Sequence, residues 1–299
     1  MGVRRRSGPA LGAAVRAAAV AAVVAGTGAW TLDAGQGGMG QPGTGQGEGP
    51  ARAAAHQAAP APVSFAALPR RVLDAHRGGG GEPGIRENSV SGAQKSLASG
   101  RVQVLDIDTR RLKDGTPVLM HDATVDRTTD HTGPVSAYTP ATWKQVRLDT
   151  GGGAPEPAPT LDQYLDALGG RAVVTVEAKD ASEVPTLASM IKARGLTSSV
   201  LVNTNDPAVA RRIHAAGLLT HLWRSAAQLA HDDPRAWTGF VDLLDIDHRA
   251  TDAQVRAAVH SGIPRVWAHT LTTAAQRDRM LALGVQGIIT DYPLSLDRR

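Results

Sequence analysis

The chain of 299 residues contains no cysteine. Without cysteine there is no disulfide framework, no thiolate nucleophile and no zinc site with thiolate ligands. Aromatic residues make up only 3% of the chain and are not interleaved with a stripe of Lys and Arg, so the sequence indicates no nucleic-acid partner. Long apolar runs are also missing, because the run at residues 17–25 is too short and too rich in alanine to predict a membrane span.

The N-terminal residues have the order of a secretory signal peptide. Four arginines precede the Ala/Val run, and small residues follow it. We therefore predict a signal peptide over residues 1–34, which makes the mature protein secreted and extracellular, exported from a bacterium, with no stable membrane span after cleavage. An uncleaved N-terminal anchor is the alternative. Residues 1–34 hold four Arg and one Asp, so +3 of the formal net charge of +4 lies there and the remainder is nearly neutral.

Residues 35–67 are dominated by Gly, Ala, Pro and Gln. Such a composition buries too little apolar surface to offset the entropy of ordering the chain. We predict a disordered linker here and a folded domain over residues 68–299.

Strand and helix patterns alternate through this domain. Strands are predicted over residues 71–76, 102–107, 116–120, 172–176, 199–202, 218–223, 240–246, 265–268 and 287–290. Helices are predicted over residues 89–99, 160–168, 183–194, 206–216, 251–261 and 272–283. Strand 116–120 follows its predecessor too closely for a parallel crossover, which leaves eight strands, most of them separated by a helix. Eight βα units in about 230 residues predict an α/β fold, the TIM (β/α)8 barrel, with a small β-hairpin insertion after the second strand. A doubly wound open sheet is the alternative.

The predicted hairpin brings carboxylate and imidazole side chains close together. A two-residue turn at Asp114-Gly115 places Asp108 opposite His121, with Asp106 one step further along the same face. Two carboxylates and an imidazole on one face suit a hard-cation site beside an acid/base group. The alternative is a surface hairpin with solvated charges.

Polar residues also follow the other predicted strands, where a barrel carries its chemistry. They include His76 and Arg77 after the first strand, Glu177 and Lys179 after strand 172–176, and, at later strands, Asn203, Trp267, His269 and Asp291. The carboxylates of Asp106, Asp108 and Glu177 suit Ca²⁺ or Mg²⁺.

Several of these residues suit an anionic substrate. Arg77 before a glycine run offers a fork for phosphate, and Lys179 either neutralises a phosphate oxygen or forms a structural salt bridge. Glu87 lies either in the site or at the start of the following helix. Trp267 either stacks on the substrate or packs in the core.

Two imidazoles, one metal ion and a cationic pair match the needs of phosphodiester cleavage. One imidazole activates the nucleophile and the other protonates the leaving oxygen. We assign no site role to the histidines without a carboxylate at ligand spacing, which are His131, His214, His221, His231, His248 and His260.

The sequence resembles the glycerophosphodiester phosphodiesterase family. The resemblance covers about residues 70–295 and rests on motifs that occur in the family's order. These are His76-Arg77-Gly78, Glu87-Asn88, Asp106-x-Asp108, LKDGTPVLMHDATVDRTT at 112–129, PTLDQYLDAL at 159–168, VEAK at 176–179, RVWAHT at 265–270 and GVQGIITDYP at 284–293. The resemblance implies a TIM barrel that hydrolyses small glycerophosphodiesters to sn-glycerol 3-phosphate and an alcohol, with a divalent cation, in lipid and glycerol metabolism. It implies His76 and His121 as the acid/base pair, Asp106, Asp108 and Glu177 as metal ligands, Arg77 and Lys179 at the phosphate, and Glu87 in the site.

The chain departs from the family pattern at several positions. The family usually has Glu at the position of Asp106, which affects the metal, and the loop of residues 78–86 is longer than usual. The usual Trp-Thr pair is Trp267-Ala268, and the Asn commonly found near it is replaced by His269-Thr270. Two alternatives therefore stay open: a phospholipase D-like barrel that releases a cyclic phosphate, and a non-catalytic barrel that binds phosphoglycerol or teichoic acid.

Overall fold

The computed structural model describes residues 63–299. The predicted signal peptide and most of the predicted linker lie outside these residues. The described part begins with a 3-10 helix, η1 (Phe65–Ala67), capped by the Ser64 side chain. Phe65 is buried, and its N–H donates to the Ser198 carbonyl over 2.8 Å. The folded domain therefore begins a few residues before Leu68, because this aromatic side chain closes one end of the core.

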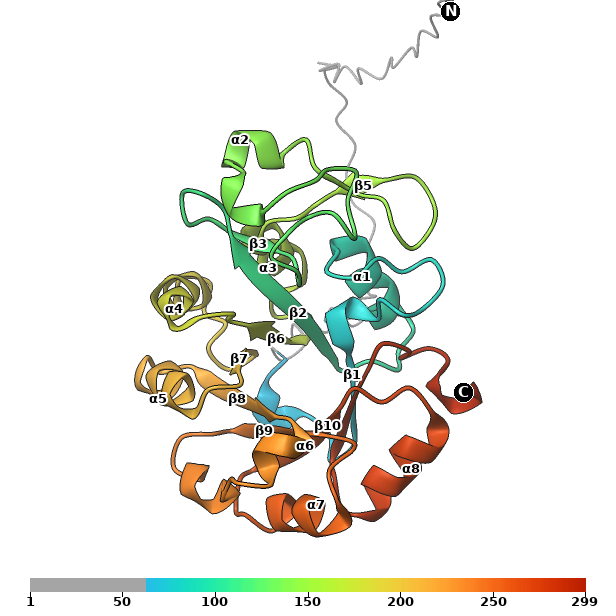
Figure 1. The fold of residues 1–299 in the computed structure, drawn as a ribbon, viewed down its shortest axis with the longest axis vertical. Helices are drawn as coiled ribbons and strands as arrows, with labels where there is room; N and C mark the ends of the chain where they lie inside the picture. The colour runs from blue at the N-terminus through green and yellow to red at the C-terminus, as the bar shows by residue number, and fades with distance from the viewer. Residues whose placement is uncertain (1–62) are drawn as a thin grey trace, which may run out of the picture. The chain divides into compact units, whose positions relative to one another are not determined.

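Eight parallel strands form a closed barrel (Figure 1), which confirms the predicted fold. They are β1 (Val72–Ala75), β2 (Val104–Arg111), β6 (Val173–Glu177), β7 (Val200–Thr204), β8 (Leu219–Arg224), β9 (Leu243–Asp247), β10 (Arg265–His269) and β11 (Gly287–Thr290). The barrel closes because β1 pairs in parallel with both β11 and β2.

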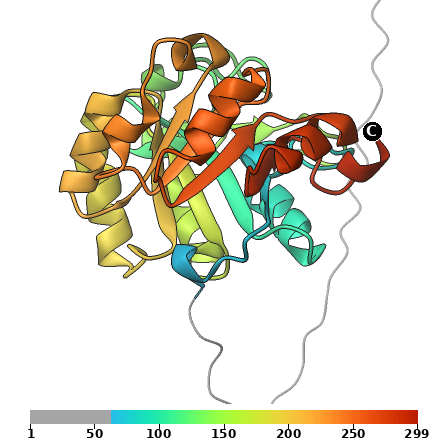
Figure 2. The same ribbon diagram turned by 90° about the horizontal axis from the view of Figure 1, so that it is seen from below.

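Helices lie outside the strands (Figures 1 and 2). The α-helices are α1 (Val90–Ala98), α2 (Pro140–Trp143), α3 (Leu161–Leu168), α4 (Val184–Ala193), α5 (Pro207–Ala215), α6 (Ala226–Leu229), α7 (Asp252–Val259) and α8 (Ala274–Ala282). Short 3-10 turns are η2 (His76–Gly78), η3 (Val135–Ala137), η4 (Ala181–Glu183), η5 (Pro234–Trp237) and η6 (Leu296–Arg298). The capping box expected from Thr160 and Gln163 begins α3. No helix within residues 63–299 has the length and apolar character to cross a bilayer.

The interior of the barrel changes from apolar to polar along the strands. One layer is an apolar cluster built from alternate strand residues, Val72, Val104, Val173, Leu201, Leu243, Trp267 and Ile289, with Phe65 beneath them. Because side chains alternate in a strand, moving two residues further along gives the next interior layer. That layer holds the buried polar residues Asp74, Asp106, Thr175, Asn203, His221 and Asp245. The sequence therefore places its polar interior toward the carboxyl ends of the strands.

The hairpin after β2 differs from the prediction by one residue. β3 (Pro117–Leu119) pairs antiparallel with β2, with Thr109 opposite Leu119. The Leu112 N–H donates to the Thr116 carbonyl over 2.9 Å, so the loop has three residues and not two. Gly115 has a φ of +91°, which suits the left-handed position that ends such a loop.

The longer loop shifts the register of the whole hairpin. Asp108 lies beside Met120, whose N–H donates to the Asp108 carbonyl over 3.1 Å. The predicted pairing of Asp108 with His121 is therefore wrong, and His121 lies just beyond the strand pair. A short two-stranded sheet, β4 (Arg147–Leu148) with β5 (Glu156–Pro157), completes the same insertion.

Candidate active site

A polar cavity of about 210 Å³ lies at the carboxyl ends of the strands, where TIM barrels carry their chemistry. Its lining comes from strands far apart in the sequence. The lining residues are His76, Arg77, Asp106, His121, Glu177, Asn203, Trp223, Asp245, His269, Thr270 and Ile289. The structure thus brings together most of the residues that the sequence singles out.

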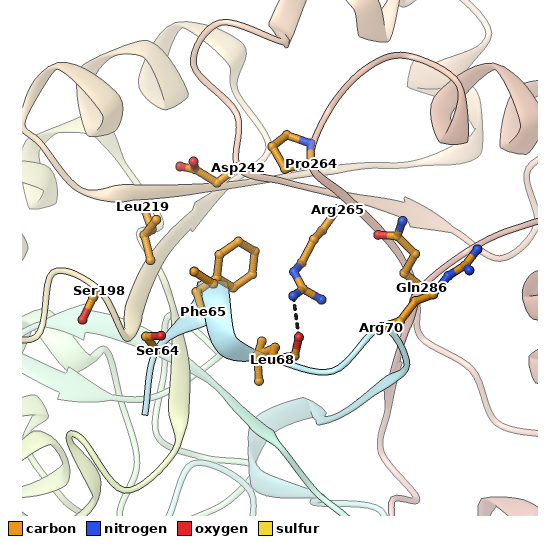
Figure 3. Close-up of a pocket in the computed structure, with 11 residues that line it drawn as sticks. Ser64, Phe65, Leu68, Arg70, Ser198, Leu219, Asp242, Pro264, Arg265 and Gln286 are labelled. Carbon is orange, nitrogen blue, oxygen red and sulfur yellow. Dashed lines mark hydrogen bonds between the residues drawn. The ribbon is translucent and has the colours of Figure 1, made fainter. Parts of the chain in front are cut away.

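A larger pocket, of about 750 Å³, lies at the opposite ends of the strands (Figure 3). Leu219 and Arg265 are the first residues of β8 and β10, and Asp242 directly precedes β9. The Arg265 guanidinium donates to the Leu68 carbonyl over 2.7 Å, as drawn in Figure 3. None of the predicted site residues lines this pocket, so its size does not make it the active site.

His76 is oriented by a carboxylate from the last strand end. Its Nδ1 lies 2.6 Å from Asp291 Oδ1, which leaves Nε2 for a ligand. Burial lowers the pKa of His76, but the hydrogen bond to Asp291 and the charge of Asp106 raise it more, so the net pKa lies above the ordinary 6.5. This histidine therefore favours the protonated form.

His121 has the same kind of partner and the opposite pKa shift. Its Nδ1 lies 2.7 Å from Asp122 Oδ1. Burial lowers the pKa of His121 below 6.5, and the charge of Asp108 offsets this only in part. The Arg110 guanidinium donates twice to the His121 carbonyl, over 3.0 and 2.8 Å, and so fixes the backbone there.

Arg127 connects this histidine to the other side of the site. Its Nη1 and Nη2 donate to the two oxygens of Glu87, both over 2.8 Å, and its Nε donates to Asp122. Glu87 also lies 3.5 Å from Arg77 Nη1. Glu87 therefore lies beside the cavity, held between two arginines.

The carboxylates of β2 and β6 lie side by side. Asp108 and Glu177 are register partners, and Lys179 Nζ lies 2.8 Å from Asp108 Oδ1 and 2.5 Å from Glu177 Oε2. Although burial opposes ionisation, Lys179 holds the pKa of Asp108 well below its usual range. Asn88 Nδ2 donates to Asp108 Oδ2 over 2.9 Å, so this carboxylate is held ionised and in one orientation.

The pKa of Asp106 is shifted in the opposite direction from that of Asp108. Burial, followed by the charge of Asp74, raises the pKa of Asp106 well above its usual value. Asp106 takes part in none of the ion pairs found in residues 63–299. Below it, both oxygens of the fully buried Asp74 lack a hydrogen-bond partner, and burial raises the pKa of that carboxyl too. A cation near Asp106 would relieve this crowding of acids.

Comparison with known proteins identifies the family. The model of the glycerophosphoryl diester phosphodiesterase family matches residues 76–217. A glycerophosphodiester phosphodiesterase of Bacillus subtilis is 28% identical over 221 residues, which cover 64% of this chain and 75% of that protein. Together these matches support the glycerophosphodiester phosphodiesterase family for this chain. Members of this family are phosphoric diester hydrolases, so the predicted enzyme class is confirmed.

Solved structures agree on the fold. A glycerophosphodiester phosphodiesterase from Thermotoga maritima aligns with a TM-score of 0.63 at 17% identity, covering 75% of this chain and 95% of that one. An Oleispira antarctica phosphodiesterase in complex with the product sn-glycerol-3-phosphate aligns with a TM-score of 0.64 at 20% identity, covering 78% and 96%. These similarities confirm the TIM-barrel fold.

The glycerophosphodiester phosphodiesterase family generally depends on a divalent cation, and the donor chemistry here fits one. Asp106, Asp108 and Glu177 offer only oxygen ligands, which Ca²⁺ and Mg²⁺ prefer. Within residues 63–299, however, no three His, Asp or Glu side chains converge as a complete metal site. The Lys179 ammonium instead lies against both Asp108 and Glu177, where it neutralises their charge. Lys179 thus forms a salt bridge with both acids.

Trp267 does not line the candidate active-site cavity. It is fully buried in the apolar layer, with its ring 6.2 Å from that of Phe65, so it packs in the core rather than stacking on a ligand. The physical reason is the strand alternation, which places Trp267 one interior layer below His269. Trp223 of β8, to which the sequence assigned no role, lines the cavity instead.

Sequence reasoning also missed the partners of the histidines. His221 lies on β8 and not on a helix or loop, fully buried, with its Nε2 3.7 Å from Asp245 Oδ2. His269 Nδ1 lies 2.7 Å from the same oxygen. The interior alternation of β8, β9 and β10 could have revealed this group, because it places His221, Asp245 and His269 on the inner face of adjacent strands.

Proposed function

We propose that this protein hydrolyses glycerophosphodiesters to sn-glycerol 3-phosphate and an alcohol, with His76 and His121 as the acid/base pair. The observation that carries this proposal is that the two imidazoles line one cavity while each is held at Nδ1 by its own carboxylate. Such a partner fixes the tautomer and the orientation of an imidazole and directs Nε2 toward the substrate.

The pKa directions assign the two roles. His121, with its lowered pKa, is neutral near pH 7 and accepts the proton of the attacking water. His76, with its raised pKa, donates its proton to the leaving alkoxide. The oxygen of water forms the new bond to phosphorus, and the bond from phosphorus to the alcohol oxygen breaks. The reaction leaves His121 protonated and His76 neutral, and a proton exchange with solvent restores both.

Charge on the phosphate needs cationic partners. Arg77 lines the cavity and supplies a planar fork for two phosphate oxygens. Lys179 lies against the carboxylates of Asp108 and Glu177 and supplies a second positive charge near the phosphate. A divalent cation held by Asp106, Asp108 and Glu177, either Ca²⁺ or Mg²⁺, would supply charge neutralisation at the phosphate oxygens.

The size of the cavity favours a small substrate. Its volume of about 210 Å³ is below the roughly 300–1,000 Å³ that is typical of sites for drug-sized ligands. A deacylated diester of glycerol suits this volume, whereas a phospholipid with two acyl chains does not. We also propose that the protein is secreted, which rests on the N-terminal residues alone.

The test is a panel of glycerophosphodiesters assayed with Ca²⁺, Mg²⁺ or a chelator, with glycerol 3-phosphate as the detected product. We expect turnover that the chelator abolishes, and a loss of about 10²–10⁴-fold in kcat for His121→Ala. Equal rates for wild type and His121→Ala would refute the acid/base assignment. A cyclic phosphate product, seen by ³¹P NMR, would show that an internal hydroxyl of the substrate, and not water, is the nucleophile. Binding without turnover under every cation would leave only a phosphoglycerol-binding role.

A further inference from the structure

The cavity contains a third pair of histidine and carboxylate that the proposed reaction does not use. His269, at the end of β10, lies 2.7 Å through Nδ1 from Asp245 Oδ2 of β9. His269 lines the same cavity as His76 and His121. The acid/base pair and the acidic residues belong to β1, β2, β6 and the segments that directly follow β1 and β3, whereas this third pair belongs to the opposite arc, β7 to β10. The diester has two organic halves, so the opposite arc is free to bind one of them.

The arc offers both a donor and an acceptor of hydrogen bonds. His269 lines the cavity, and its Nδ1 lies 2.7 Å from Asp245 Oδ2, close enough for an ion pair but outside hydrogen-bond geometry. Asn203 of β7 is 5% exposed, lines the cavity, and has an Oδ1 without a hydrogen-bond partner. A buried acceptor without a partner is costly, so a ligand that donates to it gains free energy. An alcohol hydroxyl both donates and accepts, and therefore matches this pair.

An aromatic ring completes the arc. Trp223 of β8 lines the cavity, and its ring meets the His269 ring edge to face, with centroids 5.6 Å apart and planes at 85°. The indole gives an apolar surface for the C–H groups of a ligand whose hydroxyls reach His269 and Asn203. This mixture of a flat apolar surface and a few convergent polar groups suits a polyol.

The charges in this arc disfavour a cationic alcohol. Burial lowers the pKa of His269, but Asp245 raises it more, so the net pKa lies above the ordinary 6.5. Two carboxylates of this arc already have close basic partners: Asp245 Oδ2 lies 2.7 Å from His269 Nδ1, and Asp247 lies 2.7 Å from Arg249 Nη2. A trimethylammonium group has no hydrogen-bond donor, so it would leave the Asn203 acceptor unsatisfied, and it would lie beside an imidazole whose pKa is raised.

We propose that His269, Asn203 and Trp223 form a subsite for a polyhydroxylated alcohol moiety, of the glycerol or cyclitol type, and that this subsite selects against choline. The proposal rests on the proposed function, since it names the substrate class of that same cavity.

The test compares kcat/KM for glycerophosphoglycerol, glycerophosphoinositol and glycerophosphocholine. We expect the wild type to prefer the two polyol substrates over the choline substrate by at least about tenfold. His269→Val should reduce that preference by about tenfold, mainly through KM of the polyol substrates, because one hydrogen bond to the ligand is lost. Asn203→Ala is a second variant with the same expected direction. His260→Val, at the exposed end of α7, is the matched control and should leave all three values unchanged.

Binding to the His121→Ala variant keeps this test separate from turnover. If no diester is cleaved, the proposed hydrolysis fails, while calorimetry can still show tighter binding of glycerophosphoinositol than of glycerophosphocholine. Equal use or equal binding of polyol and choline ligands would overturn the subsite. A preference that survives both His269→Val and Asn203→Ala would overturn it as well.

Discussion

At the scale of single residues, the two proposed acid/base histidines differ in which charge state their surroundings favour. Asp291 and Asp106 outweigh burial at His76, whereas burial outweighs Asp108 and Asp122 at His121. Titratable groups whose surroundings move their pKa values apart are suited to opposite roles in proton transfer. The proposed donor is then the more basic imidazole and the proposed acceptor the less basic one.

This separation predicts a bell-shaped pH dependence of kcat/KM. Activity needs His121 neutral, so its rising limb lies below pH 6.5, and it needs His76 protonated, so its falling limb lies above pH 6.5. Asp291→Asn removes the hydrogen bond that raises the pKa of His76, so the falling limb should move to lower pH. Asp122→Asn is the matched variant and should move only the rising limb, also to lower pH. A falling limb that stays in place in Asp291→Asn would contradict the assignment of His76.

The sequence suggested these residues but not their hydrogen-bond partners. Asp291 was noticeable as a polar residue after a predicted strand, yet its contact with His76 spans 215 positions. Only the closure of the barrel, which pairs β1 with β11, brings the two strand ends together. Residue type and strand position were therefore predictable, whereas the hydrogen bonds that set each pKa needed the three-dimensional arrangement.

At the scale of elements, strands were easier to predict than their exact register. The β-branched runs predicted all eight barrel strands near their observed positions, because buried parallel strands are nearly continuous in apolar residues. The hairpin register depended on whether Gly115 closes a loop of two or of three residues, which sequence spacing alone does not decide. A single extra loop residue moved Asp108 from His121 to Met120.

The contact between β10 and β11 gives a prediction about stability. A Cβ on Gly287 would lie 2.5 Å from the Trp267 ring, which has no room to move inside the barrel. Gly287→Ala should therefore lower the free energy of unfolding by about 1–3 kcal/mol, measured by urea denaturation. Gly239→Ala is the control, since no atom lies within 4 Å of its added Cβ.

A double variant distinguishes overpacking from a general effect of the added methyl group. Trp267→Leu should recover part of the loss caused by Gly287→Ala, because the smaller side chain leaves space for the new Cβ. Additive losses in the two variants would show that Trp267 does not pack against Gly287.

At the scale of the whole molecule, we expect the buried acids to make stability depend on divalent cations. Burial raises the pKa of both Asp106 and Glu177, and Asp106, unlike Glu177 with Lys179, takes part in none of the ion pairs found in residues 63–299. We expect Ca²⁺ or Mg²⁺ to raise the unfolding temperature, by the equivalent of about 2.7 kcal/mol at a concentration of 100 times Kd. Asp106→Asn should abolish most of this rise, and Asp106→Glu should increase it, because the longer side chain reaches further toward an ion shared with Glu177.

Asp252→Asn is the control for the cation effect, since Asp252 pairs with Arg279 on the outside of the barrel. It should respond to the cation as the wild type does. An unchanged response in Asp106→Asn would place the cation elsewhere.

A buried glutamate behind the site makes stability depend on pH. Glu183 is 4% exposed, and its Oε2 accepts from Thr109 Oγ1 over 3.0 Å and from the Lys179 N–H over 3.3 Å. Burial raises its pKa from 4.5 to about 7. Between these two values the folded chain binds more protons than the unfolded chain, so this group's contribution to stability is complete below pH 4.5 and is lost as pH rises through about 7.

Glu183→Gln should remove this dependence while keeping an acceptor for Thr109 and Lys179. Relative to wild type, its free energy of unfolding should rise by up to about 3 kcal/mol between pH 4 and pH 8, measured by urea denaturation at each pH. Asp114→Asn provides a control of opposite sign, because hydrogen bonds from Thr116 lower the pKa of Asp114, and an ionised Asp114 therefore stabilises the fold at higher pH. If the difference between Glu183→Gln and wild type were the same at both ends of this range, Glu183 would not titrate between them. The Thr109 and Lys179 contacts would then hold a carboxylate that is ionised throughout.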